Sequence, residues 1–323
     1  MKAILQPRFG SPDVLEYGDV EKPQPGDDEV LIEVHAASIN PMDRHFIRGK
    51  PYIIRPMVGF RKPKNPRGGF DVSGVVEAIG KNVTRFKPGD EVFGVCRGAY
   101  AEYACTRESA LALKPANITF EEAAAVTVAA ITALQGLRDT GRVQPGQRVL
   151  INGASGGVGT FAVQIAKSLR AHVTGVCSTR NVDLVRSLGA DAVIDYTRDD
   201  FTRGGEPYDV LFDCIGNHSF SASRRVLKPK GRYVMVGSQV SSWISPFDRL
   251  LHALLVSLFV SQKLVPVLAK TKKGDLEILG DLLQAGTIHS VIDRTYNLRD
   301  TADAMRYFGE GHARGKVIIR VAA

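Results

Sequence analysis

The sequence predicts an α/β protein with two domains, one rich in β-strands and one built as a doubly wound parallel sheet. In the first third, alternating runs such as VLIEVHA (Val30–Ala36) and VSGVVEAI (Val72–Ile79) are separated by proline and glycine turns. After Thr119, continuous apolar runs alternate with helical stretches, which is typical of a parallel sheet covered on both faces. The length of 323 residues also fits two domains.

The second domain is expected to begin with a long helix and to continue as β/α alternation. Thr119 and Glu122 have the spacing of a capping box at the start of an Ala-rich stretch. The short strand KVIIRV near the end of the chain is expected to return to the β-rich domain. We therefore predict that residues 1–121, completed by 290–323, form the β-rich domain and that residues 122–289 form the parallel-sheet domain.

The segment INGASGGVGTFAVQIAK joins an apolar strand to an amphipathic helix. A dinucleotide site needs small residues at such a turn because the backbone must approach a pyrophosphate and the helix must lie close to the strand. Glycines also serve plain βα turns, but this turn lies inside a βαβαβ run, and the N–H groups that begin the helix would face the phosphates. The predicted contact residues are Ala154, Ser155, Gly156, Gly157, Val158 and Gly159.

The end of the next strand favours NADPH over NADH. Domains that bind NAD carry an acid about 20 residues after the glycine turn, where it accepts hydrogen bonds from the ribose. Here the strand HVTGVC is followed by Ser178-Thr179-Arg180-Asn181, with no acid before Asp183. Ser178 and Arg180 can bind a 2′-phosphate, which an acid would repel. The alternative interpretation is a helix cap beside an exposed arginine.

With these motifs the chain resembles the medium-chain dehydrogenase/reductase superfamily, in its quinone oxidoreductase (zeta-crystallin-like) branch. The resemblance covers nearly the whole chain and rests on SINPMD, GGFDVSGVVEAIG, FKPGDEVFG, AAITAL, NGASGGVG, the LGAD–VIDY pair and GHARGKVII. It implies a discontinuous GroES-like domain, a Rossmann domain that binds NADPH, a substrate cleft between the two, and a homodimer. The implied reaction is zinc-free hydride transfer to a quinone or another α,β-unsaturated carbonyl compound.

The resemblance also implies site residues. Asn40 is similar to the family asparagine near the nicotinamide and substrate, and it is expected to act in catalysis and in cofactor binding. Tyr52 is a candidate proton source, with a surface aromatic as the alternative. Thr127 stands where many relatives have proline. The expected cofactor contacts are completed by Thr127, Tyr196, Ile215, Gly237, Phe259, Gly315 and Lys316.

No metal is expected. By the resemblance, Asn40 stands where the zinc alcohol dehydrogenases have a catalytic cysteine, and Asp71 lies near the position of their His-Glu pair. Their four-cysteine zinc lobe has no counterpart between Glu91 and Arg107, where only Cys96 and Cys105 occur. A tetrahedral site of N and S ligands cannot be assembled from these residues.

Charge and cysteine usage narrow the partners and the compartment. The net charge of +8 is scattered, apart from a run between Arg44 and Arg67 that contains no acid, so a phosphate-bearing cofactor is a better partner than nucleic acid. Four cysteines without a CxxC pair predict a reducing, cytoplasmic location. The first residues lack the apolar core of a signal peptide, and we expect none.

The stretch LLHALLVSLFV, Leu250 to Val260, is shorter than the ~20 residues of a membrane span. It is also too apolar for a free loop. We expect Leu255 to Val260 to form an apolar wall above the nicotinamide, and a peripheral membrane contact is the alternative.

Three other functions stay open. One is an enoyl or 2-haloacrylate-type reductase of the same family. Another is a crystallin-like protein that binds NADPH with little turnover. The third is binding of AU-rich RNA, suggested by the basic run from Arg44 to Arg67.

Overall fold

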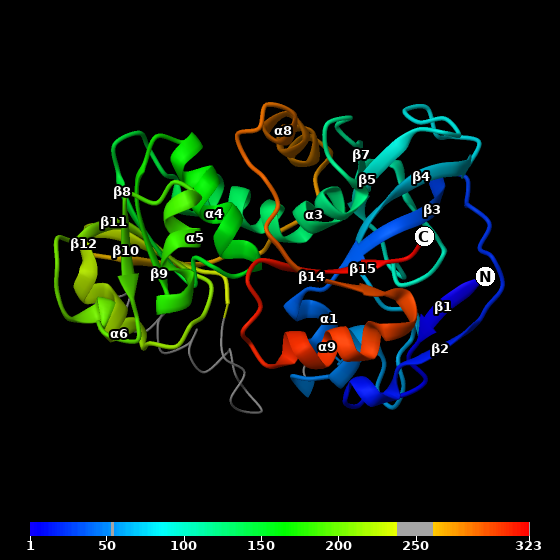
Figure 1. The fold of residues 1–323 in the computed structure, drawn as a ribbon, viewed down its shortest axis with the longest axis horizontal. Coiled ribbons are helices and arrows are strands. Elements are labelled where there is room, and N and C mark those ends of the chain that lie inside the picture. Colours follow the sequence, from blue (N-terminus) through cyan, green and yellow to red (C-terminus); the bar gives the residue numbers. More distant parts are fainter. Residues whose placement is uncertain (53–54, 238–260, 323) are drawn as a thin grey trace. The chain divides into compact units, whose positions relative to one another are not determined.

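The computed structural model describes residues 1–52, 55–237 and 261–322, and the chain divides into two compact units. The first unit contains Met1–Ile131 and Lys270–Ala323, and the second contains Thr132–Ala269 (Figure 1). The predicted wall, Leu255 to Val260, lies outside the described residues.

The first unit is built on a seven-stranded sheet in the order β14-β15-β3-β4-β5-β7, with β6 also paired to β3. Adjacent strands of this sheet run antiparallel, except that β14 and β15 run parallel to each other. The strands are β3 (Glu29–Ser38), β4 (Asp71–Ile79), β5 (Glu91–Val95), β6 (Tyr103–Arg107), β7 (Leu111–Leu113), β14 (Ile292–Asn297) and β15 (Lys316–Arg320), beside a separate hairpin of β1 (Lys2–Leu5) and β2 (Glu16–Asp19). The helices are α1 (Pro41–Arg48), α2 (Arg55–Val58), α8 (Lys273–Gln284), α9 (Thr301–Gly309) and the first part of α3 (Phe120–Gln135).

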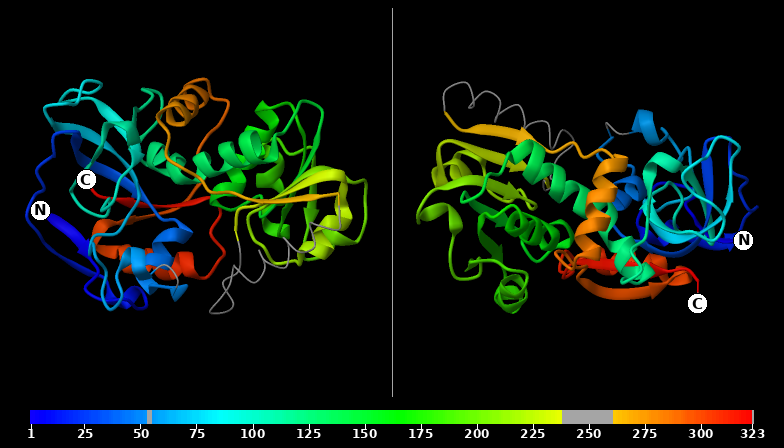
Figure 2. Two further views of the ribbon diagram at one scale, coloured as in Figure 1. Left: turned by 180° about the vertical axis from the view of Figure 1, so that it is seen from behind. Right: turned by 90° about the horizontal axis from the view of Figure 1, so that it is seen from above.

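The last strand returns to the first sheet, as predicted. Ile318 and Ile319 of β15 pair with Ser38 and Ala37 of β3, and Figure 2 shows the red end of the chain beside the blue strand. The first unit is therefore discontinuous in sequence.

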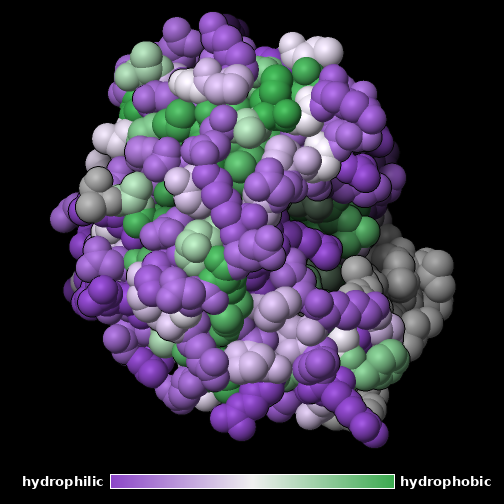
Figure 3. All heavy atoms as spheres, turned by 90° about the vertical axis from the view of Figure 1, so that its right-hand side faces the viewer, coloured by the Kyte–Doolittle hydropathy of each residue, from purple (hydrophilic) through white to green (hydrophobic). Residues whose placement is uncertain are grey.

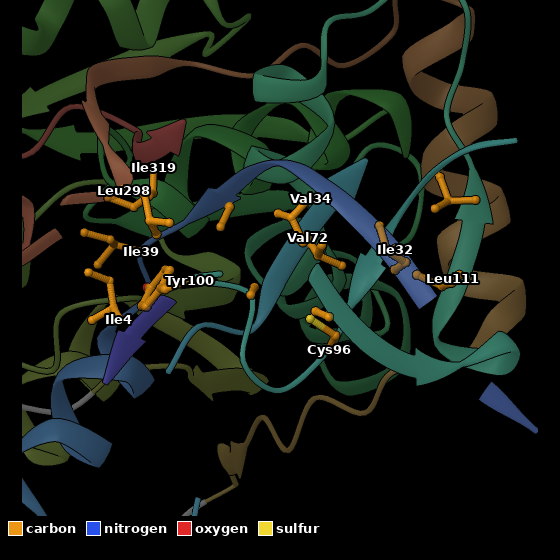
Figure 4. Packing of buried hydrophobic residues seen from close by; sticks show 14 of the residues in the cluster. Ile4, Ile32, Val34, Ile39, Val72, Cys96, Tyr100, Leu111, Leu298 and Ile319 are labelled. Carbon is orange, nitrogen blue, oxygen red and sulfur yellow. The ribbon is translucent and has the colours of Figure 1, made fainter. Parts of the chain in front are cut away.

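Alternating residues of β3 build the core of this unit. Val30, Ile32 and Val34 are at most 1% exposed and belong to one hydrophobic cluster. Figure 4 shows Tyr100 of the same cluster beside Ile4 and Ile39. The period-two pattern of the sequence thus placed the buried side of this strand correctly.

The second unit is a doubly wound parallel sheet, as predicted. Its six strands are all parallel and follow the order β10-β9-β8-β11-β12-β13. They are β8 (Arg148–Asn152), β9 (His172–Cys177), β10 (Ala192–Asp195), β11 (Tyr208–Asp213), β12 (Leu227–Met235) and β13 (Lys263–Pro266), and they are joined with α4 (Gly157–Ser168), α5 (Val182–Ser187) and α6 (Phe220–Ser223). The strand order reverses between β8 and β11, which makes their carboxyl ends the topological switch point where such sheets bind ligands.

The two unit boundaries differ from the predicted ones. Residues 122–131 lie in the first unit, because Ala124 and Ala125 of α3 pack against Ala36 and Ile318. Residues 270–289 also lie there, because α8 packs beside β7 and Glu277 of α8 forms a 3.1 Å ion pair with Arg85. The sequence showed the helices but not which sheet they cover.

Helix α3 begins with the expected capping box. The Thr119 N–H donates to Glu122 Oε2 (2.8 Å), and the Glu122 N–H donates to Thr119 Oγ1 (3.2 Å). The helix continues as a π-helical turn, Gly136–Gly141.

Phe120–Gly141 is the one helix of the described residues that is long and apolar enough to cross a membrane. Within it, 72% of the apolar window is buried inside the protein, as expected of a core helix. Hydrophilic side chains cover most of the face in Figure 3, and hydrophobic ones show between them in scattered areas.

Candidate functional site

A buried carboxylate, Asp71, lies at the start of β4 in the first unit, directly opposite Ser38 at the end of β3. It is fully buried. Its Oδ1 accepts hydrogen bonds from the Thr127 hydroxyl and from the Val128 N–H (2.9 Å), and its Oδ2 accepts from the Ser38 hydroxyl. Charge-assisted bonds of this kind are the strong ones, so Asp71 fixes three segments of the chain against one another.

Lys316, at the start of β15, compensates this charge. Its Nζ lies 3.1 Å from Asp71 Oδ2, and the two side chains are 3% and 0% exposed. The same Nζ donates to Asn40 Oδ1 (2.7 Å) and to the Ile39 carbonyl (3.2 Å). All three ammonium hydrogens are therefore used inside the protein, which makes Lys316 a positioning residue for Asn40. Removing one partner of such a pair leaves a buried charge and costs about 3–5 kcal/mol.

Both polar atoms of the Asn40 side-chain amide form hydrogen bonds. Its oxygen accepts from Lys316, and its Nδ2 donates to Asp71 Oδ2 (2.8 Å). Asn40 is also the N-cap of α1, where Pro41 follows at the first helical position, a residue order that favours a helix start. The hydrogen bonds among the described residues use one of the two hydrogens on Asn40 Nδ2, and Asn40 is only 2% exposed, so the second hydrogen can be donated only to a ligand oxygen that reaches this buried position.

Asp43 adds a second buried carboxyl next to this network. Its Oδ2 accepts the Asn40 N–H at 2.7 Å. Burial raises the pKa of Asp43 to about 7, with the Asn40 N–H opposing the rise, the Asp71 charge adding to it and Lys316 opposing it. Burial also raises the pKa of Tyr100 well above its ordinary value, and the nearby Asp43 charge adds to that effect.

The glycine turn in the second unit connects β8 to α4 at the switch point. A Cβ on Gly159 would lie 2.0 Å from the Gly153 carbonyl oxygen, so helix and strand approach too closely for any side chain there. A Cβ on Gly156 would meet no protein atom closer than 3.5 Å. The absence of a side chain at Gly156 is therefore not required by packing. Because Gly156 has no side chain, a ligand could approach the first N–H groups of α4, which have no hydrogen-bond partner within the helix.

Asp213, at the end of β11, organises the neighbouring loop. It accepts from Asn152 Nδ2 (2.8 Å), the Tyr233 hydroxyl (2.6 Å) and the N–H groups of Ile215 (3.0 Å) and Gly216 (2.9 Å). Ile215, a predicted cofactor contact, is 40% exposed on this loop.

Gly237, another predicted contact, lies against the same loop. A Cβ there would lie 2.0 Å from the Cys214 carbonyl oxygen. Sequence reasoning missed Asp213, although a single acid in the apolar run VLFDCIG could have identified it.

Asn181 links the glycine turn to the predicted phosphate-binding turn. Its Nδ2 donates to Ser155 Oγ (3.0 Å) and to Ser178 Oγ (3.2 Å). Asn181 is 5% exposed, and its Oδ1 has no hydrogen-bond partner among the described residues. A ligand hydroxyl would satisfy that oxygen, since a buried acceptor without a partner is costly.

An acid that the sequence interpretation did not consider lies at this same edge. Asp195 ends β10 opposite Cys177 of β9, and it accepts from the Thr179 hydroxyl at 2.6 Å. This hydrogen bond is the main cause that lowers the pKa of Asp195, so the side chain is ionised. Thr197 and Arg198 also contact its carboxylate. The search for an acid along the β9 turn missed Asp195 because parallel pairing brings it from the next strand.

The remaining predicted residues lie apart from these clusters. Tyr52 is 38% exposed, with the Arg55 guanidinium 4.9 Å from its ring centre, and the structure does not bring it into the Asp71 network. Tyr196 is 58% exposed at the end of β10. Gly315 has a positive φ of 77° next to Lys316, and Phe259 lies outside the described residues.

The two cysteines between Glu91 and Arg107 are poor metal ligands in this fold. Cys96 is 3% exposed in the hydrophobic core, where burial raises the pKa of its thiol. Burial also raises the pKa of Cys105 to about 11. Zinc binds the thiolate, which these environments disfavour. In the part of the chain that the structure describes, no three His, Cys, Asp or Glu side chains are grouped to hold a metal ion.

Known proteins share this architecture. Residues 26–116 match the model of the alcohol dehydrogenase GroES-like domain, and residues 188–319 match that of the zinc-binding dehydrogenase family. A chloroplastic quinone-oxidoreductase homolog of Spinacia oleracea is 34% identical over 96% of this chain and 95% of its own length. The NADPH-dependent alkenal/one oxidoreductase of Arabidopsis thaliana is 33% identical over 99% of this chain and 79% of its own.

A solved structure agrees with these relatives. The quinone oxidoreductase from Coxiella burnetii superposes with a TM-score of 0.87 at 30% identity, covering 100% of this chain and 99% of that one. Two family models in the expected order, relatives along the whole length and the fold itself support one conclusion. The chain is an oxidoreductase that belongs to the quinone oxidoreductase family of the medium-chain dehydrogenase/reductase superfamily.

Proposed function

We propose that this oxidoreductase transfers a hydride from NADPH to a quinone or another α,β-unsaturated carbonyl compound, and that it does so without zinc. The observation that carries the proposal is the glycine turn at the switch point of the parallel sheet. Gly159 is required by packing, whereas Gly156 is not, so the open space at Gly156 is explained by a ligand that approaches the backbone there. The orphaned Oδ1 of the buried Asn181 is a second feature that suits a nucleotide.

The choice of NADPH rests on Ser178 and Arg180. Both residues follow β9, where a 2′-phosphate would lie, and a guanidinium binds phosphate through paired hydrogen bonds. The ionised Asp195 nearby opposes this choice. Its carboxylate, however, is held by the Thr179 and Thr197 hydroxyls and lies 3.6 Å from Arg198, which reduces its repulsion of a phosphate. The Arabidopsis relative is itself named as NADPH-dependent.

Bound NADPH would supply the hydride, so the side chains need only orient and polarise the acceptor. The amide of Asn40 suits this task because Lys316 and Asp71 fix its orientation and leave one N–H to donate to a carbonyl oxygen. Such a donor stabilises the negative charge that develops on the oxygen as hydride arrives at the β-carbon. Protonation then completes the reduction, and we assign the proton to solvent or to the exposed hydroxyl of Tyr52.

The zinc-free part of the proposal has support from the thiols. Burial raises the pKa of Cys96 and Cys105 and so favours their protonated forms, and by the family resemblance Asn40 occupies the position of the catalytic cysteine of zinc alcohol dehydrogenases. In this proposal the Asn40 amide, oriented by the Asp71–Lys316 ion pair, would polarise the acceptor carbonyl where a zinc enzyme uses a Lewis acid.

Substitutions at Gly156 and Gly159 should affect cofactor binding and folding stability differently. In Gly156→Ala, we expect the NADPH dissociation constant to rise about tenfold or more, because the methyl group occupies the space of the phosphates, while the urea midpoint stays unchanged. In Gly159→Ala, we expect a loss of about 1–3 kcal/mol in unfolding free energy from overpacking. Fluorescence titration and urea denaturation measure the two effects. Unchanged NADPH affinity in Gly156→Ala would contradict a phosphate-binding site at this glycine turn.

Replacing Arg180 tests the cofactor preference. Arg180→Ala should weaken NADPH binding by about 1.5–3 kcal/mol, a factor of roughly 10 to 150, with a far smaller effect on NADH. Arg186→Ala is the matched control, because Arg186 is an exposed arginine of α5 and should change neither affinity. Equal losses for both cofactors in Arg180→Ala would overturn the assignment.

An acceptor screen tests the proposed reaction. We expect protein dialysed against a chelator to oxidise NADPH with quinones or enones at an undiminished rate, and to contain well under one zinc per chain. Enoyl thioesters belong in the same screen. Stoichiometric zinc lost together with activity would refute zinc independence, and tight NADPH binding without turnover on any acceptor would refute the enzyme in favour of a binding protein.

A further inference from the structure

A cavity of about 130 Å³ lies inside the first unit, between β1, α1 and the segment from Pro63 to Phe70. Its apolar walls include Ile4, Leu15, Phe46, Ile47 and Val58. A dry cavity of about 150 Å³ in another protein binds benzene, so this one has room for one six-membered ring. Figure 4 shows two of its lining residues, Ile4 and Tyr100, side by side.

The inner end of the cavity carries a polar atom without a partner. Asp43 lines the cavity, is 2% exposed, and uses its Oδ2 to accept the Asn40 N–H. Its Oδ1 has no hydrogen-bond partner among the described residues. The Tyr100 hydroxyl lies 3.4 Å from the Ser38 carbonyl oxygen and is also close enough to the Asp43 carboxyl to lower its pKa, so a ligand hydroxyl would share this carboxyl with Tyr100. A hydroxyl on a ligand would satisfy Oδ1 in either protonation state of Asp43, because a hydroxyl both donates and accepts.

The outer end is cationic. Lys64 and Arg97 are exposed and Arg67 is half-buried, and all three line the cavity. In the described part of the chain, none of the three takes part in an ion pair, and the run from Arg44 to Arg67 contains no acid that could compensate them. Two guanidinium groups at the mouth of an apolar cavity suit a carboxylate or a phosphate.

We propose that this cavity binds a small aromatic anion, with a ring between the apolar walls, a hydroxyl group on Asp43 Oδ1 and a carboxylate or phosphate at Arg67 and Arg97. Asn40, Thr127 and Lys316 do not line the cavity, but Asp43 does and also accepts the Asn40 N–H, so the site adjoins the residues assigned to hydride transfer without including them. The inference does not depend on the proposed reaction.

Calorimetric titration of the NADPH-saturated protein with 4-hydroxybenzoate and with 4-hydroxyphenyl phosphate tests this site. We expect at least one of them to bind with one molecule per chain, and the tighter of the two identifies the anionic group. Benzoate lacks the hydroxyl and phenol lacks the charge, so each should bind about tenfold or more weakly. A crystal structure of the complex should show the ring in the cavity.

Variants of the lining residues locate the binding. The double variant Arg67→Gln, Arg97→Gln should weaken binding about tenfold or more, and Val58→Phe should abolish it by filling the cavity. The double variant Arg61→Gln, Lys62→Gln is the matched control, because these exposed cations belong to the same basic run, Arg44 to Arg67, but do not line the cavity. It should leave the affinity within about twofold.

Three results would overturn the proposal. One is the absence of binding by both probes. Another is binding that Val58→Phe and the Arg67/Arg97 variant leave unchanged, which would place the ligand elsewhere, for example at the acceptor site. The third is a crystal structure of the soaked protein with only water in the cavity.

Discussion

The ion pair between Asp71 and Lys316 has almost no access to water, so protein groups must satisfy both charges. The Asp71 carboxylate also accepts hydrogen bonds from the Ser38 and Thr127 hydroxyls and from the Val128 N–H. The Lys316 ammonium also donates to the side-chain oxygen of Asn40 and to the Ile39 carbonyl. These partners come from β3, from the link between β3 and α1, and from α3, whereas Asp71 and Lys316 themselves belong to β4 and β15. The strands and helices that carry these groups are therefore fixed relative to one another within the first unit. The orientation of the Asn40 amide follows from its hydrogen bonds to the ion pair.

This constraint explains why the first unit is discontinuous. Asp71 and Lys316 are 245 positions apart, and they meet because β15 adds to the edge of β3. Without the returning strand, Asp71 would keep an unpaired buried charge and Asn40 would lose the donor on its oxygen. The second unit follows a local rule instead: β8, the glycine turn and α4 are consecutive, and their form depends on small side chains at close approaches. Orientation of the acceptor and binding of the cofactor are thus assigned to separate parts of the chain.

These two kinds of constraint also decide how much of the structure could be predicted. The glycine turn, the capping box at Thr119 and the parallel sheet were readable because their patterns are local in sequence. Asn40, Thr127 and Lys316 could be named one by one through a family resemblance, but nothing local shows that they meet on Asp71. Asp195 and Asn181 were missed for the same reason. Parallel pairing of β10 with β9 places Asp195 beside the turn that follows β9, and Asn181 forms a hydrogen bond with Ser155, 26 positions away.

The central claim, that this chain moves a hydride from NADPH to a conjugated carbonyl compound, is tested most directly with NADPH that carries deuterium at both C4 positions. A cyclic enone is reduced with this cofactor by protein dialysed against a chelator, and the product is analysed by NMR. The account predicts one deuterium at the β-carbon and a solvent-derived hydrogen at the α-carbon. Product without deuterium at the β-carbon, or binding of the labelled cofactor with no product from any enone or quinone, would contradict it.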